Sequence, residues 1–282
     1  MRASLGIEDR NTVPILRDVA KDEETMESVF YFPGCGSEKL FSNVGLASLA
    51  MLHHAGVRTV LPPGYLCCGY PSRTAGDAPE SDRITYENRV LFHRMATALS
   101  YLDIKTVVVS CGTCFDQLMI YEMEKIFPGC RIVDIHELLL ERGYGGLGVA
   151  GRQYMYHEPC HTPLKHHGAQ KTLATLIGEG VSHPERCCGE AGTLAVTRPD
   201  IAAKIRHRKE EEIEAIPIQS GDRKILTTCP ACLQGLSRLA DETGAEAEYV
   251  VTEMAATVLG KGWEQRFVNH VLNKGGIERV LL

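Results

Sequence analysis

Cysteine spacing constrains this chain more than any other feature of its sequence. Ten of the eleven cysteines form two groups of five, with the spacings C-x31-CC-x42-CxxC and C-x26-CC-x40-CxxC. The flanking residues repeat as well, because VVVSCGTCFDQL parallels ILTTCPACLQGL and FYFPGC parallels MYHEPC. This self-similarity indicates an internal duplication. The first quintet is Cys35, Cys67, Cys68, Cys111 and Cys114, and the second quintet is Cys160, Cys187, Cys188, Cys229 and Cys232.

Composition limits the compartment and the partners. With 282 residues, 44% of them hydrophobic, the chain can bury one large core or two small ones. Its net charge of −6 is too mild to indicate binding to nucleic acid or to an anionic membrane surface. Residues 1–30 lack the apolar stretch of a secretory signal, and no apolar run is long enough for membrane insertion. We therefore expect a cytoplasmic protein that reaches a membrane only through a partner, and whose cysteines serve metal or redox chemistry.

Short β-rich runs alternate with helical stretches in each half of the chain, which predicts an α/β fold. We expect two pseudo-symmetric halves, each with a small parallel sheet flanked by helices. The expected strands are Ser28–Phe32, Arg58–Leu61, Thr106–Ser110, Arg131–Asp134, Gln153–His157, Lys224–Thr228 and Glu246–Val251. The expected helices are Glu38–His54, Arg83–Leu102, Cys114–Ile126, Gln170–Ile177, Pro199–Ala215 and Ala231–Thr243.

A glycine-rich stretch, ERGYGGLGVAGR, separates the two halves at residues 141–152. It divides the chain into a leader or linker at 1–28, a first domain at 29–145, and a second domain with a tail at 146–282. In this arrangement four cysteines follow strands directly, where open α/β sheets build their sites. Each CxxC pair also opens a helix, whose positive end favours an anionic cluster.

Five thiols in each half can serve several kinds of site. Structural zinc takes four ligands, so it would leave one cysteine spare. A thioredoxin-like motif, strand–CxxC–helix, would explain four of the ten cysteines and leave six without a role. An iron–sulfur cluster takes several thiolates, and adjacent cysteines can bind neighbouring irons or one shared iron. Gly69 and Gly189, which follow the cysteine pairs, would let the backbone approach inorganic sulfide, although ordinary turn glycines fit the same pattern.

The repeated pattern resembles the CCG, or cysteine-rich, domain of heterodisulfide reductase. The same domain occurs in the iron–sulfur subunits of glycolate oxidase and lactate utilisation systems. The resemblance covers roughly Phe30 to Leu259 and implies that each quintet binds one [4Fe-4S] cluster. It favours the non-cubane type held by all five thiolates, with a cubane cluster and one spare thiol as the alternative.

Other segments, among them FPGCGSEKLFSNVGLASLAMLHHAG and GGIERVLL, resemble the carboxy-terminal part of FAD-linked oxidases of the D-lactate dehydrogenase type. The chain lacks the flavin part of those enzymes, and it lacks the C-x2-C-x2-C-x3-C-P run of ferredoxins. The resemblance thus implies that this chain binds no flavin itself. The implied partners are a flavoprotein dehydrogenase subunit or domain and a ferredoxin-type iron–sulfur subunit.

Three functions follow from the resemblance. In the first, the chain carries electrons through two [4Fe-4S] clusters from a flavin-linked 2-hydroxyacid dehydrogenase of the D-lactate or glycolate type. In the second, it cleaves a disulfide at non-cubane clusters between the halves, as heterodisulfide reductase does. In the third, it is a regulatory iron–sulfur protein without turnover. Whether the chain is itself an enzyme stays open, and no residue outside the quintets is assigned a catalytic role.

Several polar residues near the quintets have plainer explanations. We interpret Cys130 as a structural thiol. As neutral imidazoles, the histidines around Cys160 could ligate metal or relay protons to a substrate sulfur. The plainer interpretation is that His157 is a satisfied strand residue and that His166 and His167 are solvated loop residues. His161, next to Cys160, is the histidine we single out for mutation. The remaining candidate is Glu190, which fits a carboxylate at a helix start or a proton donor.

Overall fold

A six-stranded sheet organises the first half of the computed structural model, which describes residues 1–18, 26–190 and 194–282. Its order is β5-β4-β2-β3-β1-β9, and the first four strands are parallel. Both faces of this parallel part are covered, which is why its strands read as continuous apolar runs such as SVFYF and TVVV. The strands are β1 (Thr12–Leu16), β2 (Ser28–Phe32), β3 (Arg58–Val60), β4 (Thr106–Val109), β5 (Arg131–Asp134) and β9 (Ile277–Leu281).

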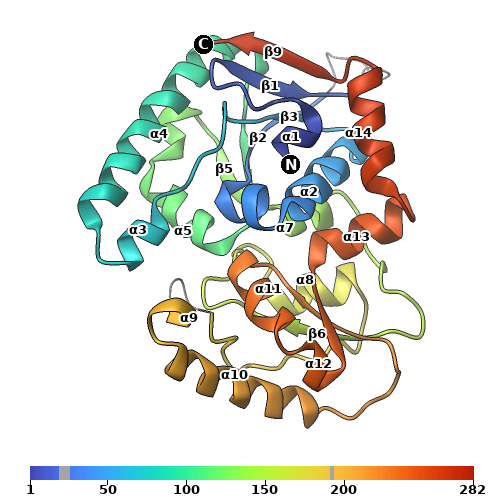
Figure 1. Cartoon of the computed structure of the whole chain (residues 1–282). Coiled ribbons are helices and arrows are strands. Elements are labelled where there is room, and N and C mark those ends of the chain that lie inside the picture. Colours follow the sequence, from blue (N-terminus) through green and yellow to red (C-terminus); the bar gives the residue numbers. More distant parts are fainter. Residues whose placement is uncertain (19–25, 191–193) are drawn as a thin grey trace.

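Alternate residues of β2 face different cores. Val29 and Tyr31 belong to a cluster with helices α2, α7, α13 and α14, whereas Phe30 and Phe32 belong to one with α4, α5 and α6. Figure 1 shows the helices on both sides of the sheet. The helices of this unit are α1 (Arg2–Leu5), the π-helix η1 (Gly36–Leu40), α2 (Ser42–His54), α3 (Tyr70–Thr74), α4 (Ala78–Ala98), η2 (Ser100–Leu102), α5 (Gly112–Ile120), α6 (Met123–Ile126), α7 (Ile135–Glu141), α13 (Val250–Leu259) and α14 (Trp263–Asn273).

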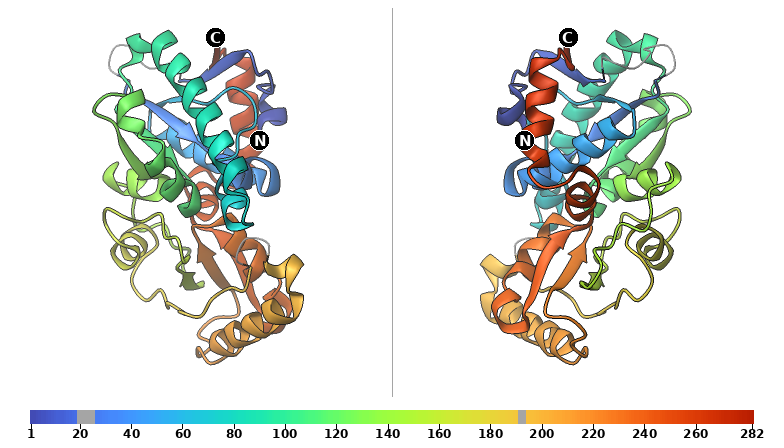
Figure 2. Two further views of the ribbon diagram at one scale, coloured as in Figure 1. Left: turned by 90° about the vertical axis from the view of Figure 1, so that its left-hand side faces the viewer. Right: turned by 90° about the vertical axis from the view of Figure 1, so that its right-hand side faces the viewer.

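The second half is built on a three-stranded parallel sheet of order β6-β7-β8. Figures 1 and 2 show this unit stacked below the first. Its strands are β6 (Gln153–His157), β7 (Arg223–Thr227) and β8 (Ala245–Tyr249), and its helices are α8 (Ala169–Leu176), α9 (Leu194–Thr197), α10 (Pro199–Glu214), α11 (Pro230–Ser237) and α12 (Ala240–Thr243).

The element order of the first half recurs in the second. Strands β2, β4 and β5 correspond in chain order to β6, β7 and β8, and helices α2, α4, α5, α6 and α7 correspond to α8, α10, α11, α12 and α13. Strand β3 has a reduced counterpart, a single parallel bridge between Met155 and Ser182. The duplication seen in the cysteines therefore extends to the secondary structure.

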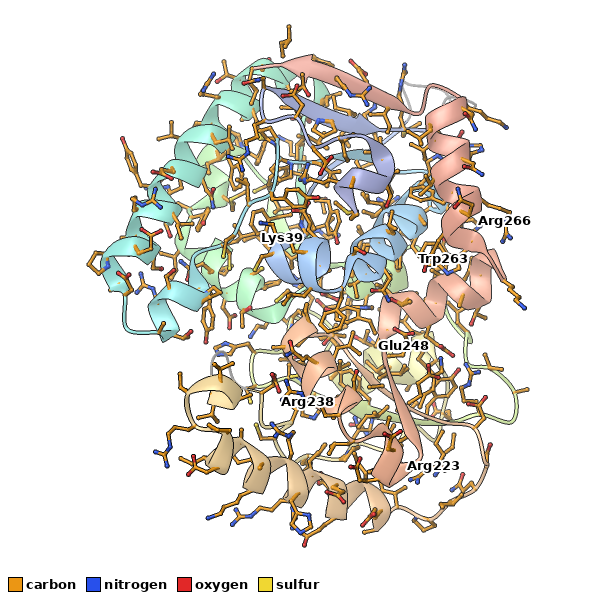
Figure 3. All side chains as sticks on the ribbon, viewed as in Figure 1. Lys39, Arg223, Arg238, Glu248, Trp263 and Arg266 are labelled. Carbon is orange, nitrogen blue, oxygen red and sulfur yellow. The ribbon has the colours of Figure 1, made fainter. Side chains whose placement is uncertain are left out.

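The two ends of the chain extend the first sheet beyond the repeat. Strand β1 lies antiparallel to both β3 and β9, so the first sheet is larger than expected and mixed at one edge. After β8, helices α13 and α14 return to the first unit, and Trp263, labelled in Figure 3, joins its core. The stretch expected as a leader thus contains α1 and β1, while its residues 19–25 lie outside the described residues.

The predicted α/β class, with parallel sheets flanked by helices, is confirmed. The division into domains at 29–145 and 146–282 stays a prediction. None of the helices that the structure describes is both long and apolar enough to span a membrane.

Candidate metal centres

The cysteines of both quintets gather at the carboxyl ends of parallel strands. Cys35 and Cys160 each lie three residues beyond a strand, β2 and β6. Cys111 and Cys229 have extended backbones and cap helices α5 and α11, with Cys114 and Cys232 in the first turns. The adjacent pairs lie on loops, so residues from distant parts of the chain converge at one edge of each sheet.

The first quintet forms a continuous set of sulfur contacts. The Sγ atoms of Cys35 and Cys67 are 3.9 Å apart, and the neighbouring thiols of Cys111 and Cys68 raise the pKa of Cys114. Three of these five residues are buried, namely Cys68, Cys111 and Cys114. The backbone of the adjacent pair is held from α4 and α5, because Asn88 donates to the Cys67 carbonyl at 2.8 Å and Tyr121 to the Cys68 carbonyl at 2.9 Å.

The second quintet surrounds a cavity. The Sγ atoms of Cys188 and Cys232 are 3.4 Å apart, and Cys188 also contacts Cys187. All five cysteines line a cavity of about 280 Å³, which residues of the first half close on one side. Its lining is Tyr70, Thr74, Thr113, Pro159, Cys160, His161, Cys187, Cys188, Cys229, Ala231 and Cys232.

The two quintets meet at the junction of the halves. The thiols of Cys111 and Cys229 are close enough to shift each other's pKa, downward for Cys111 and upward for Cys229, so one CxxC motif lies against the other. Around this contact, each of two cysteine loops of the first half packs against a cysteine loop of the second half, in a pseudo-twofold arrangement. Gly36, which follows Cys35, faces Pro230, and Gly112, which follows Cys111, faces the backbone of His161. The expectation that both quintets lie at a central junction therefore agrees with the geometry.

The glycine after each cysteine pair has a local reason to be glycine. Gly69 and Gly189 have φ angles of +89° and +77°, in the left-handed region. Their N–H groups donate to the first sulfur of the pair, at 3.5 Å to Cys67 and 3.4 Å to Cys187. A side chain on either glycine would press against the helix that follows, α4 or α10. Their predicted contact with inorganic sulfide stays a prediction.

Comparison with known families identifies this arrangement. A model of the cysteine-rich (CCG) domain matches residues 29–119 and 154–237, which together make up more than half of the chain. The chain belongs to the cysteine-rich (CCG) domain family. A second model, a domain of unknown function (DUF3400), matches residues 237–282, which contain the returning helices and β9.

Several individual proteins are similar to the chain over most of its length. An uncharacterized iron–sulfur protein of Methanocaldococcus jannaschii is 26% identical over 86% of the chain and 49% of that protein. A subunit of the fumarate reductase (CoM/CoB) of Methanothermobacter marburgensis is 26% identical over 72% of the chain and 40% of that protein. Lactate utilization protein A of an Exiguobacterium species is 25% identical over 75% of the chain and 89% of that protein. The chain spans about half or less of the first two proteins, and the matches confirm the predicted resemblance to iron–sulfur proteins.

The thiols of the CCG quintets cannot all ionise without a counter-charge. Because the Cys35 thiol donates to Cys67, the pKa of Cys67 is lowered to about 3, while the pKa of Cys35 is raised. In the second quintet the neighbouring thiols of Cys187 and Cys232 lower the pKa of Cys188, and the pKa of each of these two neighbours is raised. Bound iron would supply the positive charge that deprotonates the remaining thiols. The donor set therefore fits an iron–sulfur cluster in each half.

His157 lies beside the second quintet. It is buried at the end of β6, with a relative exposure of 2%. No partner with hydrogen-bond geometry faces its ring nitrogens within the part of the chain that the structure describes, but the ring lies against the Cys188 thiol and lowers the pKa of that thiol. A ring nitrogen and the sulfurs of Cys188 and Cys232 lie within 4.8 Å of one another. The sequence does distinguish this position: when MYHEPC is aligned with FYFPGC, His157 of the second half corresponds to Phe32 of the first.

His161 joins the two halves through a chain of hydrogen bonds. The Tyr70 hydroxyl lies 2.7 Å from His161 Nε2, and His161 Nδ1 lies 2.6 Å from Asp116 Oδ2. Asp116 also pairs with Lys165 at 3.3 Å. Tyr70 and Asp116 belong to the first half and His161 to the second, and both Tyr70 and His161 line the cavity. Sequence reasoning found His161 but gave no sign of its partners.

The other polar residues singled out from the sequence have structural partners. The backbone N–H groups of His166 and His167 donate to Glu137 of α7 at 2.8 and 2.7 Å, so their loop is fastened to the first half. Glu190 is buried and pairs with Arg238, labelled in Figure 3, at 3.4 Å. Burial raises the pKa of the Glu190 carboxyl. Cys130 is partly buried against the core of the first half, and burial raises the pKa of its thiol.

Proposed function

We propose that this CCG protein carries electrons through two [4Fe-4S] clusters of the non-cubane type. Cys35, Cys67, Cys68, Cys111 and Cys114 would hold the first, and Cys160, Cys187, Cys188, Cys229 and Cys232 the second. The observation that supports this function most directly is the proximity of the Cys111 and Cys229 thiols, which brings the two quintets together. Such contact provides the short route that electron transfer between two centres needs.

The electron donor we propose is a flavoprotein dehydrogenase for a 2-hydroxy acid such as D-lactate or glycolate. The likeness to lactate utilization protein A supports this choice. A ferredoxin-type iron–sulfur subunit would complete the path, since such clusters commonly carry single electrons between larger centres. The complex would be cytoplasmic or bound to a membrane through a partner.

Metal analysis after anaerobic purification tests the cofactors. We expect about eight irons and eight sulfides per chain, with little zinc in the same sample. Cys68→Ser and Cys188→Ser should each lose about half of the iron and sulfide, because each removes one ligand of a different centre. Cys130→Ser is the matched control and should retain both clusters. Stoichiometric zinc without sulfide would contradict the proposal, and unchanged cluster spectra in both serine variants would contradict the five-thiolate assignment.

A second function is favoured by the cavity beside the second quintet. Its volume of about 280 Å³ and its position between the halves would allow a small disulfide to reach the second centre. The likeness to the fumarate reductase (CoM/CoB) subunit is consistent with such chemistry. The two functions differ in what the reduced protein does alone. Rapid reduction of small disulfides without a flavoprotein would favour disulfide cleavage, whereas reduction of the clusters by a 2-hydroxy acid only through a flavoprotein would favour electron transfer.

A further inference from the structure

His157 is a buried imidazole that lies against the Cys188 thiol, and none of the described residues meets its ring nitrogens in hydrogen-bond geometry. It ends β6 and lies beside the sulfurs of Cys188 and Cys232, with 2% of its surface exposed. A neutral imidazole carries one N–H donor and one acceptor nitrogen, and a buried polar group without a partner is costly. Thr227, its neighbour in register on β7, also has a buried side-chain oxygen for which the described part of the chain offers no partner. The site therefore places a ring nitrogen beside the sulfurs of the second quintet, with a hydroxyl at the neighbouring position in register.

The first half differs at the same two positions. Phe32 ends β2 as His157 ends β6, and Phe32 is in register with Val109 as His157 is with Thr227. Phe32 packs edge-on against Phe92, with ring centroids 6.0 Å apart, in the same core as Cys68, Cys111 and Cys114. The first quintet thus has two apolar neighbours, Phe32 and Val109, where the second quintet has the polar residues His157 and Thr227.

We infer that the His157 N–H donates a hydrogen bond to a sulfur of the second centre, and that the two centres consequently have unequal reduction potentials. This inference rests on the proposed presence of two clusters. A reduced cluster carries one more negative charge than an oxidised one, so a donor to its sulfur favours the reduced state and raises the potential. The second centre is therefore the one that electrons occupy first.

The position of the cavity indicates which way electrons move between the two centres, given their difference in reduction potential. The cavity is lined by all five cysteines of the second quintet, together with Tyr70 and His161. Electrons that enter through the first centre cross at Cys111 and Cys229 and come to rest beside the cavity. The second centre is thus the one that meets the electron acceptor, and the first centre is the entry point.

Substitution of His157 tests the hydrogen bond through the potentials. In His157→Phe, which copies the first half, we expect the higher of the two potentials to shift toward the lower one, with the lower one unchanged. His157→Gln keeps an N–H donor and should retain part of the difference. The control is His183→Gln, an exposed histidine of the same half that stacks edge-on against Tyr156. Potentials are measured by redox titration followed by EPR, with iron and sulfide counted in each sample.

Unchanged potentials in His157→Phe at full iron content would overturn the inference. Because the variant could lose the second cluster, a measurement on the intact chain is added. Pulsed EPR of protein labelled with ¹⁵N-histidine should show a nitrogen coupled to one reduced cluster, and absence of that coupling would also overturn the inference. If the natural chain contains no iron and sulfide, the proposed function and this inference fail together. If both clusters are present without the coupling, only this inference fails.

Discussion

Two glycines allow the cysteine loops of the two halves to touch. A Cβ atom on Gly112 would lie 1.5 Å from the backbone oxygen of His161, and one on Gly36 would lie 2.7 Å from Cγ of Pro230. The glycines belong to the first half, and the bulkier residues that face them belong to the second. The pseudo-twofold contact between the quintets is therefore asymmetric in its side chains, and it requires a residue without Cβ on one side.

Gly112→Ala should separate the halves at this contact. The added methyl group meets a backbone oxygen, which cannot move aside as a flexible side chain can. We expect a loss of about 1–3 kcal/mol or more in the free energy of unfolding, together with lower iron content. Anaerobic denaturant unfolding and metal analysis measure both. Gly221→Ala is the control, because a Cβ there meets nothing within 4 Å, and equal losses in the two variants would contradict this account.

The sequence predicted that the cysteines of each quintet converge, but it said little about the residues around them. The quintets were found because their spacing recurs, and spacing survives without any knowledge of the fold. His157 was noticed but interpreted as a satisfied strand residue, because a histidine in a strand is ordinary until its surroundings are known. The hydrogen-bond partners of His161 are Tyr70 and Asp116, which lie 91 and 45 residues from it in the sequence. No local sequence pattern could therefore reveal them.

At the scale of elements, a buried ion pair fastens α1 to the π-helix that follows Cys35. Arg2 Nε lies 2.7 Å from Glu38 Oε1, and both side chains are fully buried. Burial raises the pKa of Glu38 to about 7 and lowers that of Arg2, so the cost of desolvation exceeds their mutual attraction. Arg2 and Lys39 also lie over the ring of Tyr65, which precedes the first cysteine pair.

Arg2→Met should be more damaging than removal of both charges. The single change leaves Glu38 buried without its partner, and we expect a loss of about 3–5 kcal/mol in the free energy of unfolding. The double variant Arg2→Met/Glu38→Leu should recover most of that loss, because no charge is then buried. Anaerobic denaturant titrations of the three proteins give the comparison. A double variant as unstable as the single one would contradict this account. It would show that the attraction between Arg2 and Glu38 contributes more to stability than the cost of burying their charges.

Elements inside the repeat were easier to predict than those outside it. The bounds of β2, β5 and β6 agree with the expected strands, because fully apolar or alternating runs mark them clearly. The expected helix at 38–54 is divided into η1 and α2, a break that periodicity does not show. Strand β1 was missed because Pro14 interrupts TVPIL, and proline is usual only at sheet edges or bulges. Strand β9, largely exposed, has little apolar signal.

At the scale of the whole molecule, the carboxy-terminal segment connects the two halves. Strand β9 pairs with β1 along its whole length, and α13 belongs to the core that contains α2. At the start of this return, the Tyr249 hydroxyl donates to the carbonyl of Ser110, the residue before Cys111. The expected second domain, 146–282, thus contributes residues to the first unit. Sequence repeats reveal the duplication but do not reveal such an exchange, because it depends on which surfaces meet after each half has folded.

Tyr249→Phe should loosen the junction without unfolding either half. The change leaves the buried Ser110 carbonyl without its donor, which costs about 1–3 kcal/mol. Tyr156→Phe is the matched control, since its hydroxyl lies 2.9 Å from Thr228 Oγ1, within the second half alone. Hydrogen exchange should rise at residues 110–114 in Tyr249→Phe, but near β6 and β7 in Tyr156→Phe. Because residues 110–114 carry the CxxC motif that meets Cys229, transfer between the two centres should also slow only in Tyr249→Phe. The same exchange pattern in both variants would contradict a role for Tyr249 in joining the halves.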